Sequence, residues 1–64
     1  SMITILKQQC VGESGGYIEA IGLSTDTKPS KIGSLDVTNG SAVLEMDTGD
    51  LYLYDEAGQT WIKQ

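Results

Sequence analysis

The segment Leu51-Tyr52-Leu53-Tyr54 constrains the fold more than any other, because it is apolar on both sides of an extended strand. Successive side chains of a strand point to opposite faces, so the two leucines lie on one side and the two tyrosines on the other. One side can pack on a core, and the other then needs a second chain, a ligand, or both. A chain of 64 residues has too little material to cover two apolar sheet faces alone. The segment therefore predicts contact with a partner.

The chain is short enough to need stabilisation beyond a single core. A domain of this size buries only about 60% of the surface of its unfolded chain. Cys10 is the single cysteine and histidine is absent, which excludes an intrachain disulfide and a structural zinc site. Self-association remains, and we expect one domain over residues 1–64 that forms a homo-oligomer with closed symmetry. Ser1 precedes Met2 and is interpreted as an expression remnant, so that the natural chain would be a complete small protein beginning at Met2.

The charge balance limits the classes of partner. Four lysines, no arginine and nine acidic residues give a formal net charge of −5. That sign opposes binding to polymeric DNA or RNA and to anionic membranes. A compact ligand with one or two phosphates is still compatible, because one lysine and a few backbone N–H groups can hold it locally. No run approaches the roughly 18 apolar residues of a membrane span, and no signal pattern opens the chain, so we expect a soluble intracellular protein.

The sequence of the first two-thirds of the chain predicts a β-hairpin followed by a long connecting segment. Residues 3–11 and 17–21 are rich in β-branched and apolar residues and are expected to pair as an N-terminal hairpin. The glycine-rich segment 12–16 is interpreted as its turn, because the Lys-Ser/Thr and the helix of a phosphate loop do not follow it. Residues 23–40 are irregular and polar, and we expect them to be ordered. Their anchors are Ile32, Leu35 and Val37.

The last third predicts three more strands, over residues 41–47, 51–55 and 61–63. Short turns join them, so they are expected to form an antiparallel meander. No apolar run follows helical spacing. The predicted fold class is all-β, a small antiparallel sheet made of the N-terminal hairpin and this three-stranded meander.

The polar residues do not point to catalysis. The acidic residues near the predicted turns lack the spacing of a calcium loop, and turn formation explains them better; these are Asp47, Asp50, Asp55 and Glu56. The glutamates of the predicted strands are interpreted as solvent-facing, and Cys10 has no histidine to activate it. We predict a protein that is not an enzyme, with no metal site and no cofactor.

The connection contains the best candidate ligand-binding residues. Residues 24–31 concentrate hydroxyl groups and two ammonium groups around the only proline, a set that can hold phosphate or ribose. Nearby aromatic residues can supply faces on which bases stack. The candidate site residues are Thr25, Thr27, Lys28, Tyr52, Tyr54 and Trp61. The alternative interpretation is a polar connector beside ordinary core and interface aromatics.

Several short motifs occur together in an order that resembles a family. They are Ser24-Thr25-Asp26-Thr27-Lys28-Pro29, Gly40-Ser41, Glu45-Met46-Asp47-Thr48-Gly49, Tyr54-Asp55 and the closing Trp61. This order, over roughly residues 22–63, is similar to that of short bacteriophage proteins of the head-fibre or head-associated type. The resemblance implies a phage origin and, more loosely, a role in the virion.

Two roles of phage proteins fit the expected small β-protein. One resembles the phage sponge proteins, oligomers that sequester cyclic nucleotide defence signals in pockets between subunits. That role implies phosphates at Thr25, Thr27 and Lys28, bases stacked on the tyrosines, and a location in the host bacterial cytoplasm. The other is a virion module, a head-fibre or capsid-decoration protein that binds a capsid or tail protein. No coiled coil or collagen-like shaft is present, which favours the sponge role.

Overall fold

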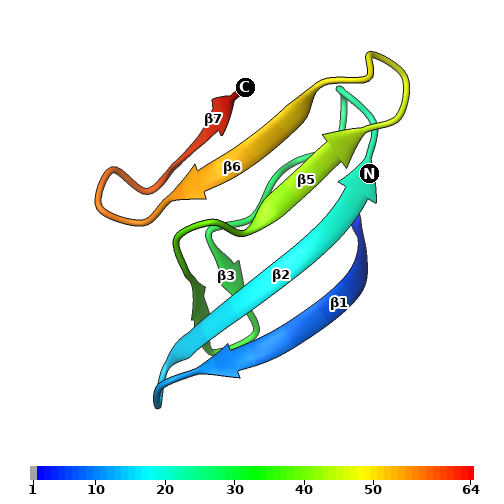
Figure 1. Cartoon of the computed structure of the whole chain (residues 1–64). Coiled ribbons are helices and arrows are strands. Elements are labelled where there is room, and N and C mark those ends of the chain that lie inside the picture. The colour runs from blue at the N-terminus through cyan, green and yellow to red at the C-terminus, as the bar shows by residue number, and fades with distance from the viewer. Residues whose placement is uncertain (1) are drawn as a thin grey trace.

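Seven strands form one curled β-sheet (Figure 1). The computed structural model describes residues 2–64; Ser1, interpreted above as an expression remnant, lies outside the described residues. The strands are β1 (Thr4–Val11), β2 (Gly15–Gly22), β3 (Lys31–Ile32), β4 (Leu35–Val37), β5 (Ala42–Glu45), β6 (Leu51–Asp55) and β7 (Thr60–Lys63). Residues 2–64 contain no helix, which confirms the all-β prediction. It follows that no helix in this part of the chain could cross a membrane.

β1 and β2 pair antiparallel along most of their length, ending with Val11 opposite Gly15. Their turn includes Gly12 at φ +65°, a left-handed conformation that glycine adopts without steric cost. The register shifts between Ile5 and Lys7, so β1 carries a bulge that increases its local twist. Every residue of β1 is exposed, because the strand lies at an edge of the sheet and has no layer over it.

The opposite edge of β2 pairs in parallel with two strands, with β4 at Gly15 and Gly16 and with β5 from Glu19 to Gly22. The prediction of an antiparallel sheet is therefore wrong at β2, and the sheet is mixed. Parallel neighbours cannot be joined by a tight turn and need a crossover. Residues 23–41 supply this crossover and include the β3–β4 pair, which explains the length of the polar connection.

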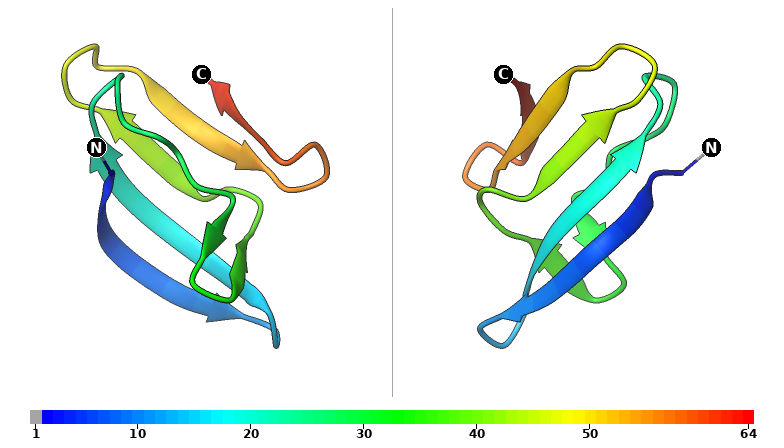
Figure 2. Two further views of the ribbon diagram at one scale, coloured as in Figure 1. Left: turned by 180° about the vertical axis from the view of Figure 1, so that it is seen from behind. Right: turned by 45° about the vertical axis from the view of Figure 1, so that its right-hand side comes forward.

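The crossover passes over one face of the sheet, called the inner side below. It runs behind β5 in Figure 1 and in front of β5 in the reverse view of Figure 2. The opposite face is called the outer side. β5, β6 and β7 are successive antiparallel neighbours, with Leu44 opposite Leu51 and Tyr54 opposite Trp61. Directly opposed residues project to the same side of a sheet.

The inner side carries a small core. Five apolar residues are buried, namely Ile18, Ala20, Val37, Val43 and Tyr54. Further half-buried side chains pack against this cluster, namely Ile3, Ile32 and Trp61. Because strand residues alternate, the buried apolar side chains of β2, β5 and β6 all belong to one face. The core is thus one layer of side chains between the sheet and the crossover.

The leucine side of β6 is the uncovered side. Leu51 is 40% exposed, whereas Tyr54 is only 5% exposed and belongs to the core. The hypothesis that the tyrosines form the second, partner-facing side is therefore wrong for Tyr54. The physical reason is the crossover, which supplies a cover for the tyrosine side from residues distant in the sequence.

Candidate functional site

In the structure, the Lys28 side chain contacts other side chains of the protein itself. Its Nζ donates a hydrogen bond of 2.6 Å to Glu45 Oε2, and the two side chains are only 14% and 4% exposed. The same ammonium lies 4.2 Å from the centre of the Tyr52 ring, a cation–π contact. Thr48 donates a further hydrogen bond to the other Glu45 oxygen, at 2.9 Å. The positive charge of Lys28 is thus neutralised, which argues against its predicted role as a phosphate ligand.

Tyr54 and Trp61 also face inwards. Their ring centres lie 4.9 Å apart with planes tilted by 56°, an ordinary packing geometry for aromatic side chains. Trp61 Nε1 donates a 2.9 Å hydrogen bond to the carbonyl oxygen of Pro29 in the crossover. We call Lys28, Glu45, Tyr52, Tyr54 and Trp61 the crossover cluster, because together they hold the crossover to β5, β6 and β7.

Thr25 and Thr27 do not belong to the crossover cluster. Both are exposed, Thr25 in a turn and Thr27 at an isolated parallel bridge with Met2. Four of the six predicted site residues are therefore brought together, but as a structural cluster. The alternative interpretation of ordinary core aromatics describes Tyr54 and Trp61.

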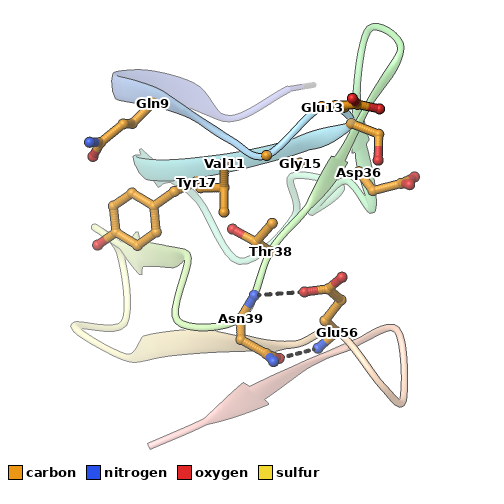
Figure 3. Close-up of a pocket in the computed structure, with 11 residues that line it drawn as sticks. Gln9, Val11, Glu13, Gly15, Tyr17, Asp36, Thr38, Asn39 and Glu56 are labelled. Carbon is orange, nitrogen blue, oxygen red and sulfur yellow. Dashed lines mark hydrogen bonds between the residues drawn. The ribbon is translucent and has the colours of Figure 1, made fainter.

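An open cavity of about 680 Å³ lies elsewhere, where the β1–β2 turn meets the end of β4 (Figure 3). Its lining comes from three parts of the chain, namely Gln9, Val11, Gly12, Glu13, Ser14, Gly15, Tyr17, Asp36, Thr38, Asn39 and Glu56. Figure 3 shows Gln9 and Tyr17 at one end and Glu13 and Asp36 at the other. The volume falls within the usual range of small-molecule sites. None of the six predicted residues lines it.

The local sequence explains the shape of this cavity. A side chain at Gly15 would overlap the Val11 carbonyl oxygen and would lie 2.7 Å from Thr38 Cγ2. Glycine at this position therefore lets the chain after β4 approach β2 closely. Asn39 and Glu56 exchange two hydrogen bonds, Asn39 N to Glu56 Oε1 at 3.3 Å and Glu56 N to Asn39 Oδ1 at 2.6 Å. These bonds fix the base of the cavity between two turns (Figure 3).

The cavity is acidic, with one cation beside it. Glu13, Asp36 and Glu56 contribute carboxylates. Lys31 Nζ lies 2.8 Å from Asp36 Oδ1, and this hydrogen bond and charge raise the pKa of Lys31. A smaller cavity of about 240 Å³ shares the Asp36 and Glu56 walls and is also lined by Ser30 and Lys31. Within residues 2–64, no group of three or more metal-ligating side chains is close enough to bind a metal ion.

Tyr17 supplies the aromatic face of the site. Its ring is half-buried, and its hydroxyl donates a 2.9 Å hydrogen bond to Glu19 Oε2. This bond to a carboxylate raises the pKa of Tyr17, so the hydroxyl stays protonated around neutral pH. The site can therefore combine ring stacking with hydrogen bonds from a ligand's hydroxyl or amino groups to carboxylates.

Sequence reasoning missed this cavity because its residues are scattered. The density of glycine in residues 12–16 was the available signal, and it was interpreted as a hairpin turn alone. Asp36 and Thr38 reach the cavity through the parallel pairing of β2 with β4, and Glu56 reaches it through its hydrogen bonds with Asn39. No motif in the sequence indicates that pairing.

A second electrostatic feature ties the start of the crossover to the β5–β6 turn, and it predicts a pH dependence. Ser24 donates both its hydroxyl and its backbone N–H to Asp47, and these hydrogen bonds lower the pKa of that carboxyl. A carboxyl group whose pKa is lower in the folded than in the unfolded state adds stability at pH values above its unfolded-state pKa. This added stability is lost as the pH falls through the folded-state pKa.

We expect wild type to lose more stability than Ser24→Ala between neutral and acid pH. Urea unfolding at neutral and at acid pH measures the loss of stability, and Ser34→Ala serves as the control. Equal losses in wild type and Ser24→Ala would contradict this prediction.

Comparison with known proteins gives no assignment: no protein-family model, no curated protein and no solved structure matches this chain. The site must therefore be interpreted from its own geometry.

Proposed function

We propose that this protein is a non-catalytic binding protein that sequesters a nucleotide-type ligand, as a homo-oligomer encoded by a bacteriophage and acting in the host cytoplasm. The observation that carries the proposal is the 680 Å³ cavity with Tyr17 at one end and Asp36 at the other. The resemblance to short phage proteins supports the phage origin. In such a mechanism the protein lowers the free concentration of a signal, so affinity and occupancy matter and no bond is broken.

The order of groups along the cavity suits a nucleotide. A base can stack on the Tyr17 ring at one end. Carboxylates such as Asp36 and Glu56 can accept hydrogen bonds from ribose hydroxyls, as acidic residues do in dinucleotide sites. Beyond them, Lys31 and Ser30 line the adjoining cavity and can hold a phosphate. The Lys31–Asp36 pair is more than half exposed, so its rearrangement for a ligand costs little.

This assignment moves the phosphate from Lys28 to Lys31. Glu45 already holds the Lys28 ammonium in a buried pair, and removing it for a ligand would leave a buried carboxylate without a partner. Freeing Lys31 from its ion pair with Asp36 carries no such cost, because both side chains are exposed.

Binding of cyclic di-AMP, cyclic di-GMP and adenosine tests the sequestration function. We expect the cyclic dinucleotides to raise the melting temperature of the purified protein, and Tyr17→Ala to weaken all three about tenfold or more in calorimetry. Lys31→Ala should weaken the cyclic dinucleotides about tenfold and leave adenosine unchanged, because only the former carry phosphate. Lys63→Ala is the matched control, since Lys63 also forms an exposed ion pair, with Asp50 at 3.4 Å. Absence of any melting shift at millimolar ligand would rule out these ligands and the proposed function with them.

A second candidate function is that of a virion module bound to a capsid or tail protein. The uncovered apolar side of the sheet supports it, because a surface of this kind suits protein–protein contact. Detection of the protein in purified phage particles would favour this function, and its absence there would favour the cytoplasmic one.

A further inference from the structure

The outer side of the sheet carries a continuous apolar patch. It crosses four neighbouring strands, β2, β5, β6 and β7, and we call it the outer patch. Its members are Ile21, Ala42, Leu44, Leu51, Leu53 and Ile62. Leu44 and Leu51 are each 40% exposed and Ile62 is 48% exposed.

The strand register makes the patch contiguous. One row of directly opposed residues runs from Ile21 through Leu44 to Leu51. The next row runs from Ala42 through Leu53 to Ile62. Opposed side chains within a row lie about 5 Å apart. Leu44 and Ala42, like Leu51 and Leu53, are two positions apart on one strand and share a face, so the two rows are adjacent. No charged residue lies within either row, and Glu19, which is opposite Ala42, borders the second row.

The patch cannot be covered by the chain itself in this fold. The crossover already lies on the inner side, where the core contains only five buried apolar residues. The outer side therefore exposes Leu44, Leu51 and Ile62 beside one another, and a contiguous apolar patch of this kind is unusual on a soluble surface.

We infer that the outer patch is the surface through which two copies of this chain associate. Each copy carries a net charge of −5, so most surfaces of two copies repel each other. A two-fold interface places the same residues of both copies together, which requires a surface that is compatible with itself. The uncharged outer patch meets that requirement, because apolar side chains bury against one another without opposing like charges.

The dimensions of the protein support the same surface. A standard interface occupies about 800 Å² on each partner, roughly a fifth of the 3987 Å² surface of this chain. The protein measures 34 × 20 × 15 Å, so a broad face of the sheet is needed to supply that area. The inner side is occupied by the crossover, and the outer side is the remaining broad face (Figure 2).

The interface would also adjoin the ligand cavity. Tyr17, Glu19 and Ile21 alternate along β2 and project to the same side, so the cavity and the outer patch share one face with Glu19 between them. A second copy on the patch therefore lies next to the cavity opening. We expect ligand affinity to increase on association; this part rests on the proposed function, whereas the association itself does not.

Two lysine substitutions test the association. Leu44→Lys places a charge in the patch, and Leu6→Lys makes the same charge change at a 65% exposed leucine in the β1 bulge, outside the patch. In sedimentation equilibrium over micromolar to millimolar protein, we expect wild type and Leu6→Lys to dimerise alike. Leu44→Lys should lower the association constant about a hundredfold or more, because burying an unpaired charge is costly. Circular dichroism checks that both variants remain folded.

The possible outcomes distinguish association through the outer patch from the proposed sequestration function. A wild type that stays monomeric throughout this range, or an equal loss in both variants, would overturn the association. Cyclic di-AMP serves as the probe of ligand linkage, and we expect Leu44→Lys to bind it more weakly than Leu6→Lys. If wild type dimerises through the patch but binds no cyclic dinucleotide, the interface stands and the proposed sequestration function fails.

Discussion

Replacing Lys28 by methionine is expected to destabilise the protein by about 3–5 kcal/mol. Methionine keeps the length of the apolar stem but removes the ammonium that pairs with Glu45 at 2.6 Å. Glu45 is 4% exposed at its side chain, so its carboxylate would be left buried without a counter-ion. The Tyr52 ring would also lose its cation. Folded proteins are stable by roughly 0.05–0.15 kcal/mol per residue, so a loss of this size is a large fraction of the total stability expected of a 64-residue chain.

A double substitution separates loss of the pair from loss of packing. Adding Glu45→Gln to Lys28→Met removes the buried charge while keeping an oxygen that can accept the Thr48 hydroxyl bond. We expect the double variant to recover most of the stability lost by Lys28→Met, because a neutral buried pair has no unpaired charge. Equilibrium urea unfolding of wild type, Lys28→Met, Glu45→Gln and the double variant measures the coupling. A cost below about 1 kcal/mol for Lys28→Met, the value typical of exposed pairs, would show that the charge is not held as described.

Replacing Trp61 by alanine is expected to cost about 3 kcal/mol, at the lower end for a large aromatic residue because Trp61 is only half-buried. The substitution removes packing against Tyr54, whose ring centre lies 4.9 Å away. It also removes the hydrogen bond to the Pro29 carbonyl, which joins the crossover to β7. Trp61→Phe retains an aromatic ring but not the N–H group, so its expected cost is about 1 kcal/mol.

The same pair of variants distinguishes a packing role for Trp61 from the predicted ligand-stacking role. Thermal and urea unfolding should show the full loss without any ligand present. If Trp61→Ala were as stable as wild type but bound cyclic di-AMP more weakly, the side chain would belong to the ligand site instead of the crossover cluster.

The sequence allowed the all-β class to be predicted, because alternation and β-branched residues mark the longer strands directly. It also identified Leu51 to Tyr54 as apolar on both sides. Which side faces the core could not be predicted, since leucine and tyrosine bury comparable apolar area. That choice is made by the crossover, through contacts such as Trp61 with Pro29, separated by 32 residues.

The candidate site was harder to predict for the same reason. Lys28 and the aromatic residues were predicted to bind a ligand, but a lysine beside tyrosines is equally consistent with a buried ion pair and with a phosphate site. Its partner, Glu45, was interpreted as solvent-facing, although it is only 3% exposed. The cavity depends on the parallel placement of Asp36 opposite Gly15. Such a pairing has no local signature in the chain, so neither Tyr17 nor Lys31 was among the predicted site residues.

The parallel placement of β2 beside β5 also has a kinetic consequence. Ile21 and Leu44 are neighbours in the sheet but 23 positions apart in the sequence, so the intervening loop must close before they can meet. The β1–β2 and β5–β6–β7 segments need only local turns, which form within microseconds. We therefore expect these two halves to be transient early species and their docking to limit the rate of folding, as contact order predicts. Newly made chains would spend that interval with the tyrosine side of β6 uncovered, and it is then that chains would be most prone to aggregate.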